Sequence, residues 1–159
     1  MKTYMDRHQF YAFKEQLLNS LKPIKNDFNF ILGIENGGRL LSEYLALHLN
    51  KPYHTIRISF YDKDDQRLFF PIVRGKDKID VIKKKVLGKF LWVDDIIDSG
   101  STLQWFINET ELQKGKDFSV VSLHWCEENS PDLKPEFFVE KKNKLDWIVY
   151  PWETNESAV

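Results

Sequence analysis

The most informative stretch of the sequence is Phe90-Leu91-Trp92-Val93-Asp94-Asp95-Ile96-Ile97-Asp98-Ser99-Gly100-Ser101-Thr102-Leu103. It begins with four apolar residues that suit a buried strand, and two adjacent carboxylates follow them. A third carboxylate and a turn rich in hydroxyl groups then precede a helical pattern. In open α/β sheets, ligands bind beyond the carboxyl ends of the strands, where this loop would lie. The stretch therefore predicts an α/β fold with a ligand site at the tip of a strand.

The turn at residues 99–102 has the features of a phosphate site. It opens a predicted helix, so free backbone N–H groups and the helix dipole favour an anion there. Gly100 lets the backbone approach a phosphate closely, and its hydroxyl-bearing neighbours are hydrogen-bond donors. Asp94 and Asp95 would lie beside this turn, where carboxylates can accept hydrogen bonds from sugar hydroxyls and hold a hydrated Mg²⁺. Aspartate caps and Ser-Gly-Ser turns are also ordinary loop chemistry, but together these groups predict a ribose phosphate ligand.

Strand and helix patterns alternate along the rest of the chain. This alternation is typical of a mostly parallel sheet flanked by helices, and residues 1–159 are expected to form a single domain. Residues 62–85 are predicted to form a mobile hairpin or long loop. The predicted strands cover residues 28–34, 53–60, 90–93, 118–125, 137–139 and 147–150, and the predicted helices cover residues 10–21, 40–49 and 102–112.

Composition narrows the class of protein. The 159 residues are 42% hydrophobic and 30% charged with a formal net charge of -1, which suits a folded domain without a basic field for nucleic acid. Cys126 is the only cysteine, so an internal disulfide and a multi-cysteine metal site are excluded. No apolar run approaches membrane-spanning length, and we expect a cytoplasmic protein without a membrane or nucleic-acid partner. Lys83–Lys85 and Lys141–Lys142 are interpreted as solvated surface.

Residues 90–102 resemble the motif with which type I phosphoribosyltransferases bind phosphoribosyl pyrophosphate (PRPP). That motif is a hydrophobic strand, two acidic residues, two apolar residues, Asp, Thr or Ser, Gly, any residue and Thr, and every element is present. Three further stretches are similar to the bacterial xanthine–guanine branch, and the resemblance spans about residues 31–153. It implies a type I phosphoribosyltransferase-like fold with a flexible catalytic loop and a small C-terminal hood. The three stretches are residues 34–38, residues 55–62 with Gln66-Arg67, and residues 146–153.

The resemblance also implies an activity in purine salvage. A 6-oxopurine-type base and PRPP would be the small-molecule partners, Mg²⁺ the cofactor, and a homodimer or homotetramer the assembly. Asp98 would lie near N7 of the purine and act as the catalytic base. The ribose hydroxyls and Mg²⁺ would bind at Asp94 and Asp95, and the base would bind at Trp147 and Ile148. The 5′-phosphate would bind at Ser99, Gly100, Ser101 and Thr102. The pyrophosphate would bind at Asn36, Gly37, Gly38, Arg39 and Arg67.

The sequence departs from the family pattern at two positions. Asn36 stands where the family usually has Arg or Lys, and Glu35 precedes it. Arg39, just after the glycine pair, could supply the missing cation. Cys126 stands where 6-oxopurine enzymes usually have a Lys facing the exocyclic oxygen, and we expect it to be a small buried side chain.

Other interpretations of the same residues remain open. The two departures favour, as an alternative, a non-catalytic regulator that keeps the fold and senses PRPP or a nucleotide. A response-regulator receiver shares the acidic cluster, but it would carry its acidic pair near the first strand. Without the resemblance, Trp147, Tyr150 and Trp152 would be interpreted as core or interface aromatics, and Gly37-Gly38 as a strand-to-helix turn.

Overall fold

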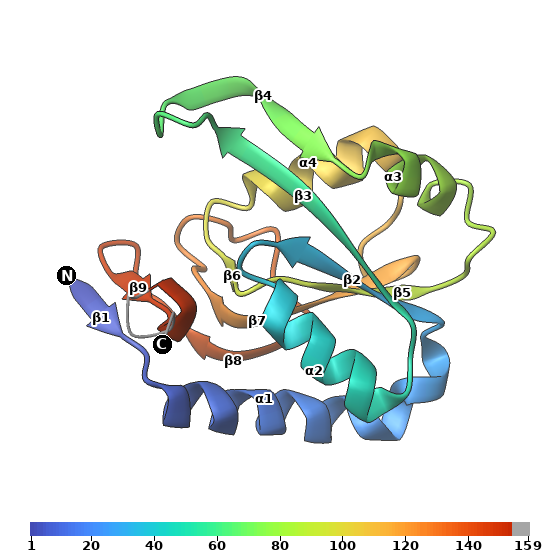
Figure 1. The fold of residues 1–159 in the computed structure, drawn as a ribbon, viewed down its shortest axis with the longest axis horizontal. Coiled ribbons are helices and arrows are strands. Elements are labelled where there is room, and N and C mark those ends of the chain that lie inside the picture. Colours follow the sequence, from blue (N-terminus) through green and yellow to red (C-terminus); the bar gives the residue numbers. More distant parts are fainter. Residues whose placement is uncertain (154–159) are drawn as a thin grey trace.

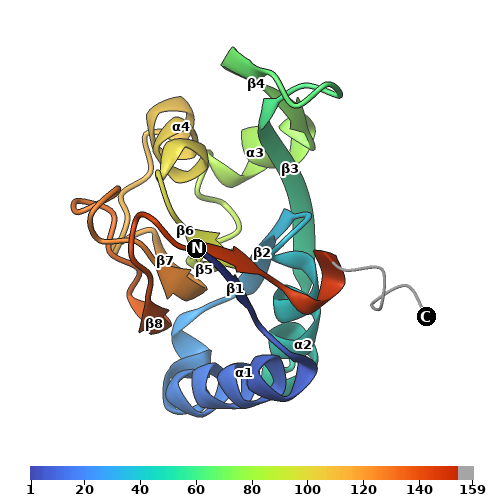
Figure 2. The ribbon, with the colours of Figure 1, turned by 90° about the vertical axis from the view of Figure 1, so that its left-hand side faces the viewer.

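The computed structural model describes residues 1–153, and it has helices on both faces of a central sheet (Figure 1). Helices α1 and α2 lie on one side, and α3 and α4 lie on the other (Figure 2). The elements are β1 (Lys2–Tyr4), α1 (Arg7–Leu21), the 3-10 helix η1 (Lys22–Asp27), β2 (Phe30–Glu35), α2 (Arg39–Leu49), β3 (Tyr53–Tyr61), β4 (Arg67–Arg74), α3 (Lys76–Ile82), β5 (Phe90–Val93), β6 (Ile96–Ile97), α4 (Ser101–Thr110), β7 (Phe118–Trp125), β8 (Phe137–Lys141), β9 (Trp147–Val149) and the 3-10 helix η2 (Pro151–Glu153).

The main sheet has seven strands in the order β4-β3-β2-β5-β7-β6, and β8 also pairs with β7. All of its pairings are parallel except that of β3 with β4. Strands β5 and β7 are buried along their whole length, because helices cover both faces of the sheet. This double cover explains why β5 is a continuous apolar run, and why even the polar Ser119, Ser122 and His124 of β7 are buried. The predicted α/β class with a mostly parallel sheet is confirmed.

Each face of the sheet has its own hydrophobic core. On one face, Leu17 of α1 and Leu45 of α2 pack against Leu91 of β5. On the other, Ile79 of α3 and Phe106 of α4 pack in the core that includes Phe90 and Trp92 of β5. Alternate side chains of one strand therefore anchor two helical layers, which fixes the position of the strand's carboxyl end and of the loop that follows it.

The segment from residue 62 to residue 85 is more regular than the sequence predicted. Its first part is a hairpin, because β4 runs antiparallel to β3, with an irregularity in the pairing between Ser59 and Tyr61. Its second part is the helix α3, whose Ile79 and Ile82 are buried. A seven-residue helix with two apolar anchors gives too little periodicity to be found by pattern, and only its packing against the sheet identifies it.

A second, two-stranded sheet contains the ends of the described chain. Residues 2–4 of β1 pair in parallel with residues 147–149 of β9. The N-terminal ammonium also donates a hydrogen bond to the carbonyl oxygen of Leu145 at 2.8 Å. Figure 1 shows this pair, which we call the hood, at the end of the molecule toward which β2 and β8 point. The predicted C-terminal hood therefore contains an N-terminal strand that the sequence did not predict.

Candidate active site

A cleft of about 280 Å³ opens at the carboxyl ends of the central strands. Its walls are the tip of β2, the loop that follows β5, and the first turn of α4. Parallel strands bring these segments together because their carboxyl ends share one edge of the sheet. Of the residues that the sequence singled out, the cleft is lined by Gly37, Asp94, Asp95, Asp98, Ser99, Gly100, Ser101 and Thr102.

Two adjacent carboxylates form the floor of the cleft. Asp94 accepts a hydrogen bond from the backbone N–H of Asp95 at 2.9 Å, and Asp95 accepts one from that of Ile96 at 2.8 Å. Loss of solvation raises the pKa of both carboxyls, and repulsion by Asp95 raises the pKa of Asp94 further. Because the ionised forms of these two carboxyls are destabilised by burial, the pair is suited to bind a cation or hydroxyl donors.

The phosphate turn, residues 99–102, has the geometry of an anion site. Gly100 adopts a φ of 76°, which disfavours other residues, and no side chain caps the helix that starts there. The Ser99 hydroxyl accepts a hydrogen bond from the backbone N–H of Ser101 at 3.3 Å, and the next N–H groups of the first turn of α4 are available to an anion. The hydroxyl oxygens of Ser99 and Ser101 lie 3.0 Å apart. Arg67, on β4, donates to the Ser101 hydroxyl at 3.3 Å while its guanidinium stacks over Phe60.

The glycine pair between β2 and α2 allows close packing against these carboxylates. A Cβ on Gly37 would overlap the carboxylate of Asp95, and one on Gly38 would lie 2.8 Å from the carbonyl oxygen of Ile34. The peptide between Glu35 and Asn36 is cis. Only glycine fits both positions, so the loop and the acidic floor form one packed unit.

The two arginines that the sequence assigned to pyrophosphate, Arg39 and Arg67, have other partners in the structure. Arg39 forms an ion pair with Glu43, one turn further along α2, at 3.0 Å, and its side chain is 61% exposed. Arg67 reaches the phosphate turn on the opposite wall. Among the described residues, neither guanidinium forms a hydrogen bond with Asn36 or the glycine pair; only the backbone N–H of Arg39 donates to the carbonyl oxygen of Asn36, at 3.3 Å.

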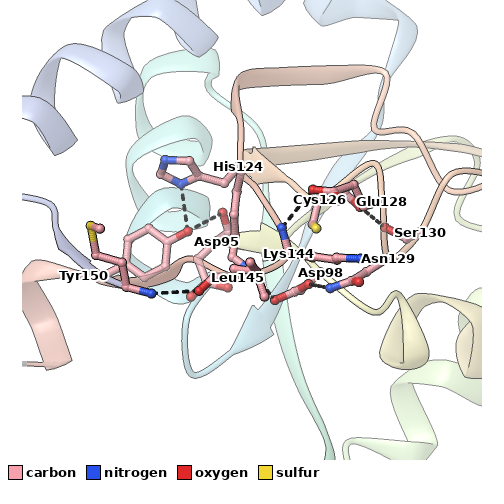
Figure 3. Close-up of polar contacts among 12 residues, drawn as sticks. Asp95, Asp98, His124, Cys126, Glu128, Asn129, Ser130, Lys144, Leu145 and Tyr150 are labelled. Atoms are coloured by element: carbon pink, nitrogen blue, oxygen red, sulfur yellow. Dashed lines mark hydrogen bonds and ion pairs between the residues drawn. The ribbon is translucent and has the colours of Figure 1, made fainter.

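Asp98 is held by two side chains that the sequence did not connect to it. The amide of Asn129 donates to its Oδ1 at 2.6 Å (Figure 3), and the ammonium of Lys142 donates to its Oδ2 at 2.9 Å. Burial alone would raise the pKa of Asp98, but hydrogen bonds from Lys142 and Asn129 outweigh it and lower the pKa. Asp98 is therefore a stable carboxylate at the mouth of the cleft.

The interpretation of Lys141–Lys142 as solvated surface is wrong for Lys142. Its side chain is only 4% exposed, whereas that of Lys141 is 56% exposed and pairs with Glu127. The signal was present in the strand pattern, because neighbouring residues at the end of a strand point to opposite sides. Of two consecutive lysines at the end of a strand, one is therefore expected to point toward the core side of the sheet.

Cys126 is fully buried, as expected for a small apolar side chain. Its backbone N–H donates to the carbonyl oxygen of Ile97 at 2.9 Å. Its thiol lies against the Asp98 carboxylate and helps to lower the pKa of that group. The position that the family usually gives to a lysine therefore borders Asp98, but it carries no charge.

The three C-terminal aromatics have different environments. Trp147 is 62% exposed, so it is not a core residue, whereas Tyr150 is 2% exposed and stacks on Trp152. The Tyr150 hydroxyl forms a hydrogen bond with Nδ1 of His124 at 2.9 Å and donates to the carbonyl oxygen of Asp95 at 3.4 Å (Figure 3). Tyr150 thereby joins the hood to the acidic floor.

The predicted base-binding residues stand apart from the cleft. Trp147 and Ile148 are on the hood strand β9 and do not line the cleft, and Ile148 instead borders a second cavity next to α1. Within residues 1–153, no group of three or more His, Cys, Asp or Glu side chains could hold a metal ion by itself.

The sequence matches the phosphoribosyl transferase domain over residues 12–157. The chain belongs to the phosphoribosyl transferase family. Its members are enzymes that transfer a phosphoribosyl group, and the resemblance inferred from the motif is confirmed. No curated protein sequence matches this phosphoribosyl transferase significantly. In the described part of the chain, no helix combines the length and the apolar character needed to cross a membrane.

Solved structures with the same fold include three that this phosphoribosyl transferase matches over nearly the whole chain. A purine phosphoribosyltransferase from Pyrococcus horikoshii is 22% identical with a TM-score of 0.71, over 96% of this chain and 94% of that one. A xanthine-guanine-hypoxanthine phosphoribosyltransferase from Helicobacter pylori is 21% identical with a TM-score of 0.72, over 99% and 97%. A hypothetical protein from Neisseria gonorrhoeae with bound ppGpp is 20% identical with a TM-score of 0.70, over 99% and 93%.

Proposed function

We propose that this enzyme transfers the 5-phosphoribosyl group of PRPP to a 6-oxopurine-type base and acts in purine salvage. The products are a nucleoside 5′-monophosphate and pyrophosphate. The observation that carries the proposal is the convergence, in one cleft, of the paired carboxylates, the phosphate turn and Asp98. Similarity to proteins described as purine and xanthine-guanine-hypoxanthine phosphoribosyltransferases supports a purine as the acceptor.

The positions of the phosphate turn and the acidic floor would orient PRPP in the cleft. Its 5′-phosphate would bind the uncapped N-terminus of α4 at Ser99–Thr102, and Arg67 would add a positive charge beside it. The ribose hydroxyls would then lie over Asp94 and Asp95. The pyrophosphate would reach the loop at Asn36–Arg39. The backbone N–H groups of Gly38 and Arg39 already donate within this loop, so those of Asn36 and Gly37 would donate to the pyrophosphate.

The paired carboxylates fit a magnesium ion that retains water. Mg²⁺ usually binds proteins through one or two carboxylates and completes its coordination with water and substrate oxygens. Asp94 and Asp95 supply two carboxylates whose charges are uncompensated in the protein, as their raised pKa values indicate. Bound with PRPP, the ion would stabilise the negative charge that develops on the departing pyrophosphate.

The residues of the cleft can perform the transfer. The bond between C1 of the ribose and the pyrophosphate oxygen breaks with its electron pair going to pyrophosphate, and N9 of the base forms the new bond to C1. The base loses a proton, and the Asp98 carboxylate would accept it near N7. Trp147 is exposed on the hood and does not line the cleft, so it would stack on the base only where the base extends beyond the cleft toward the hood. Such stacking would contribute about 1–3 kcal/mol, and the Ile148 backbone would then contact the edge of the base.

The assembly is proposed to be a homodimer or homotetramer in the cytoplasm. The β3–β4 hairpin supports an assembly, because Phe69 and Phe70 are 89% and 75% exposed on β4, at the edge of the sheet. Such a contiguous apolar edge in water is typical of a surface that another chain covers.

Pyrophosphate release tests the proposal. The protein is mixed with PRPP, Mg²⁺ and a panel of guanine, xanthine, hypoxanthine and adenine, and we expect turnover with at least one 6-oxopurine. Asp98→Ala should lower kcat by about 100-fold or more, because it removes the proton acceptor. Absence of product with every base would overturn the proposal, and an unaffected rate in the variant would remove Asp98 from the role of base.

A PRPP- or nucleotide-sensing regulator is the second candidate. It is favoured by the pyrophosphate loop, in which Asn36 is uncharged and Arg39 is paired with Glu43. A structural relative also carries bound ppGpp. Stabilisation of the protein by a nucleotide without turnover of any base would favour this candidate.

A further inference from the structure

A second cavity of about 270 Å³ lies between the hood, the start of α1 and the end of β8. It is lined by Ile148 of β9 but not by Trp147. Because neighbouring residues of a strand point to opposite sides, the cavity lies behind the hood, on the side away from the Trp147 side chain. None of its lining residues lines the cleft, so the two cavities are separate.

Buried polar groups form the depth of this cavity. The side chains of His124 and Lys142 line it and are only 5% and 4% exposed. The Lys142 ammonium has three N–H donors, and within residues 1–153 its only hydrogen bond is the one to Asp98. The remaining donors require an acceptor, and the cavity that this lysine lines has room for one.

Two carboxylates give the same cavity negative charge. Glu140 is 63% exposed, and its only ion-pair partner in the described chain is His124, at 3.4 Å. Burial lowers the pKa of His124 against the opposing effect of Glu140, so the ring is neutral near neutral pH and leaves the carboxylate charge uncompensated. Asp146 also lines the cavity, and no ion pair within residues 1–153 includes it. The other lysine of the lining, Lys141, is already paired with Glu127.

The spacing of the charged groups along β8 suits a small ligand. Strand β8 ends at Lys141, and the backbone N–H of Lys142 continues its ladder by donating to the carbonyl oxygen of Trp125 at 2.9 Å. Glu140 and Lys142 are two residues apart, so their side chains leave the same side of the strand from backbone positions about 7 Å apart. The ammonium and the carboxylate of one α-amino acid can bridge such a pair of opposite charges.

Apolar side chains supply much of the remaining lining. Met5, Phe13 and Ile148 border the cavity beside its polar groups. Pockets for drug-sized ligands have volumes of about 300–1,000 Å³, so a cavity of about 270 Å³ suits a smaller molecule. A ligand with a compact apolar body would cover these three side chains while its charged groups bind at β8.

We propose that the second cavity binds a small zwitterion of the α-amino-acid type with an apolar side chain. The carboxylate of the ligand accepts a hydrogen bond from the Lys142 ammonium, its ammonium pairs with Glu140, and its side chain packs against Phe13 and Ile148. This inference goes beyond phosphoribosyl transfer. Because the Lys142 ammonium also holds Asp98 at 2.9 Å, the ligand would contact the residue that fixes this carboxylate without entering the cleft.

Calorimetry tests the site without PRPP or a base. L-Leucine and L-phenylalanine are titrated into the wild type, and we expect saturable binding of at least one of them with a dissociation constant below about 1 mM. The corresponding amides lack the carboxylate, the N-acetyl derivatives lack the ammonium, and glycine lacks the apolar body. Each of these analogues should bind at least about 10-fold more weakly, as expected when a hydrogen bond to a charged group or the apolar contact is lost.

Two variants locate the site. Glu140→Gln removes an exposed carboxylate and Lys142→Met removes the buried ammonium, and each should weaken binding of the amino acid about 10- to 100-fold. The matched control is Glu127→Gln, which removes an exposed carboxylate outside the cavity and should bind like the wild type. Circular dichroism verifies the fold. If Lys142→Met does not fold, Glu140→Gln still decides the outcome, because its side chain is exposed.

The proposal is overturned if neither amino acid binds the wild type with a dissociation constant below about 1 mM. It is also overturned if the amides and N-acetyl derivatives bind as tightly as the parent amino acids, or if Glu140→Gln binds like the wild type. Turnover does not enter these measurements. A wild type that binds the amino acid but turns over no base would keep this site and lose the proposed transferase activity.

Discussion

Replacing Gly37 with alanine should weaken ligand binding at the acidic floor, Asp94 and Asp95, although neither aspartate is itself substituted. A Cβ at this position would lie 2.6 Å from Oδ1 of Asp95 and closer still to its Oδ2. Oδ1 alone would have to retreat by about 0.8 Å, from 2.6 Å to the 3.4 Å at which ordinary contact begins, and the closer Oδ2 would have to retreat farther. Because Oδ1 accepts the N–H of Ile96 at 2.8 Å, a displacement of this size would disturb that hydrogen bond as well.

The expected cost follows from that lost contact. A displaced Asp95 carboxylate would also lose its proposed hydrogen bond to a ribose hydroxyl. A hydrogen bond to a charged group contributes about 1.5–3 kcal/mol, so PRPP should bind Gly37→Ala about 10- to 100-fold more weakly in the presence of Mg²⁺. Isothermal calorimetry measures the affinity, and circular dichroism verifies the fold.

A double-mutant cycle isolates the mechanism. In an Asp95→Ala background the Gly37→Ala change should have little further effect, because the side chain with which the new Cβ collides is gone. The reasoning is refuted if Gly37→Ala binds PRPP like the wild type, or if it costs the same affinity in both backgrounds.

Two further substitutions test the site through stability. Asp94→Asn should stabilise the protein by about 1 kcal/mol near neutral pH, since the raised pKa means that the ionised carboxyl costs folding energy above that pKa. The gain should vanish as pH falls toward 3.8, where Asp94 is protonated in the wild type; a gain that persists in urea melts at low pH would contradict this. Tyr150→Phe should cost about 1–3 kcal/mol, because Nδ1 of buried His124 loses its partner. Equal melts for Tyr150→Phe and the exposed control Tyr4→Phe would argue against that contact.

Local pattern was sufficient for most of the secondary structure. The apolar run that became β5 and the mostly apolar run that became β7 could be assigned because a strand covered on both faces has no regular polar alternation. The short elements were missed for the opposite reason. Strand β1 has three exposed residues and exists only because β9 pairs with it, and the two-residue β6 exists only through β7.

Part of the candidate site could likewise be predicted from local sequence, and part could not. The acidic pair and the phosphate turn are contiguous in the sequence, so their chemistry and spacing could be recognised from the order of the residues alone. The surroundings of Asp98 could not, because Asn129 and Lys142 are 31 and 44 residues away from it. Residue type gave no help either, since a lysine is ordinarily exposed.

The sequence by itself determined an α/β phosphoribosyl transferase with a sugar-phosphate loop at a strand tip, because a continuous segment carries that information. Only the tertiary structure decided which cations serve the site. Arg39 turned to Glu43, Arg67 reached the phosphate turn, and Lys142 became buried against Asp98. The physical reason is that the residue type determines a side chain's charge, whereas the partner and the solvation of that charge depend on which strands lie side by side in the fold.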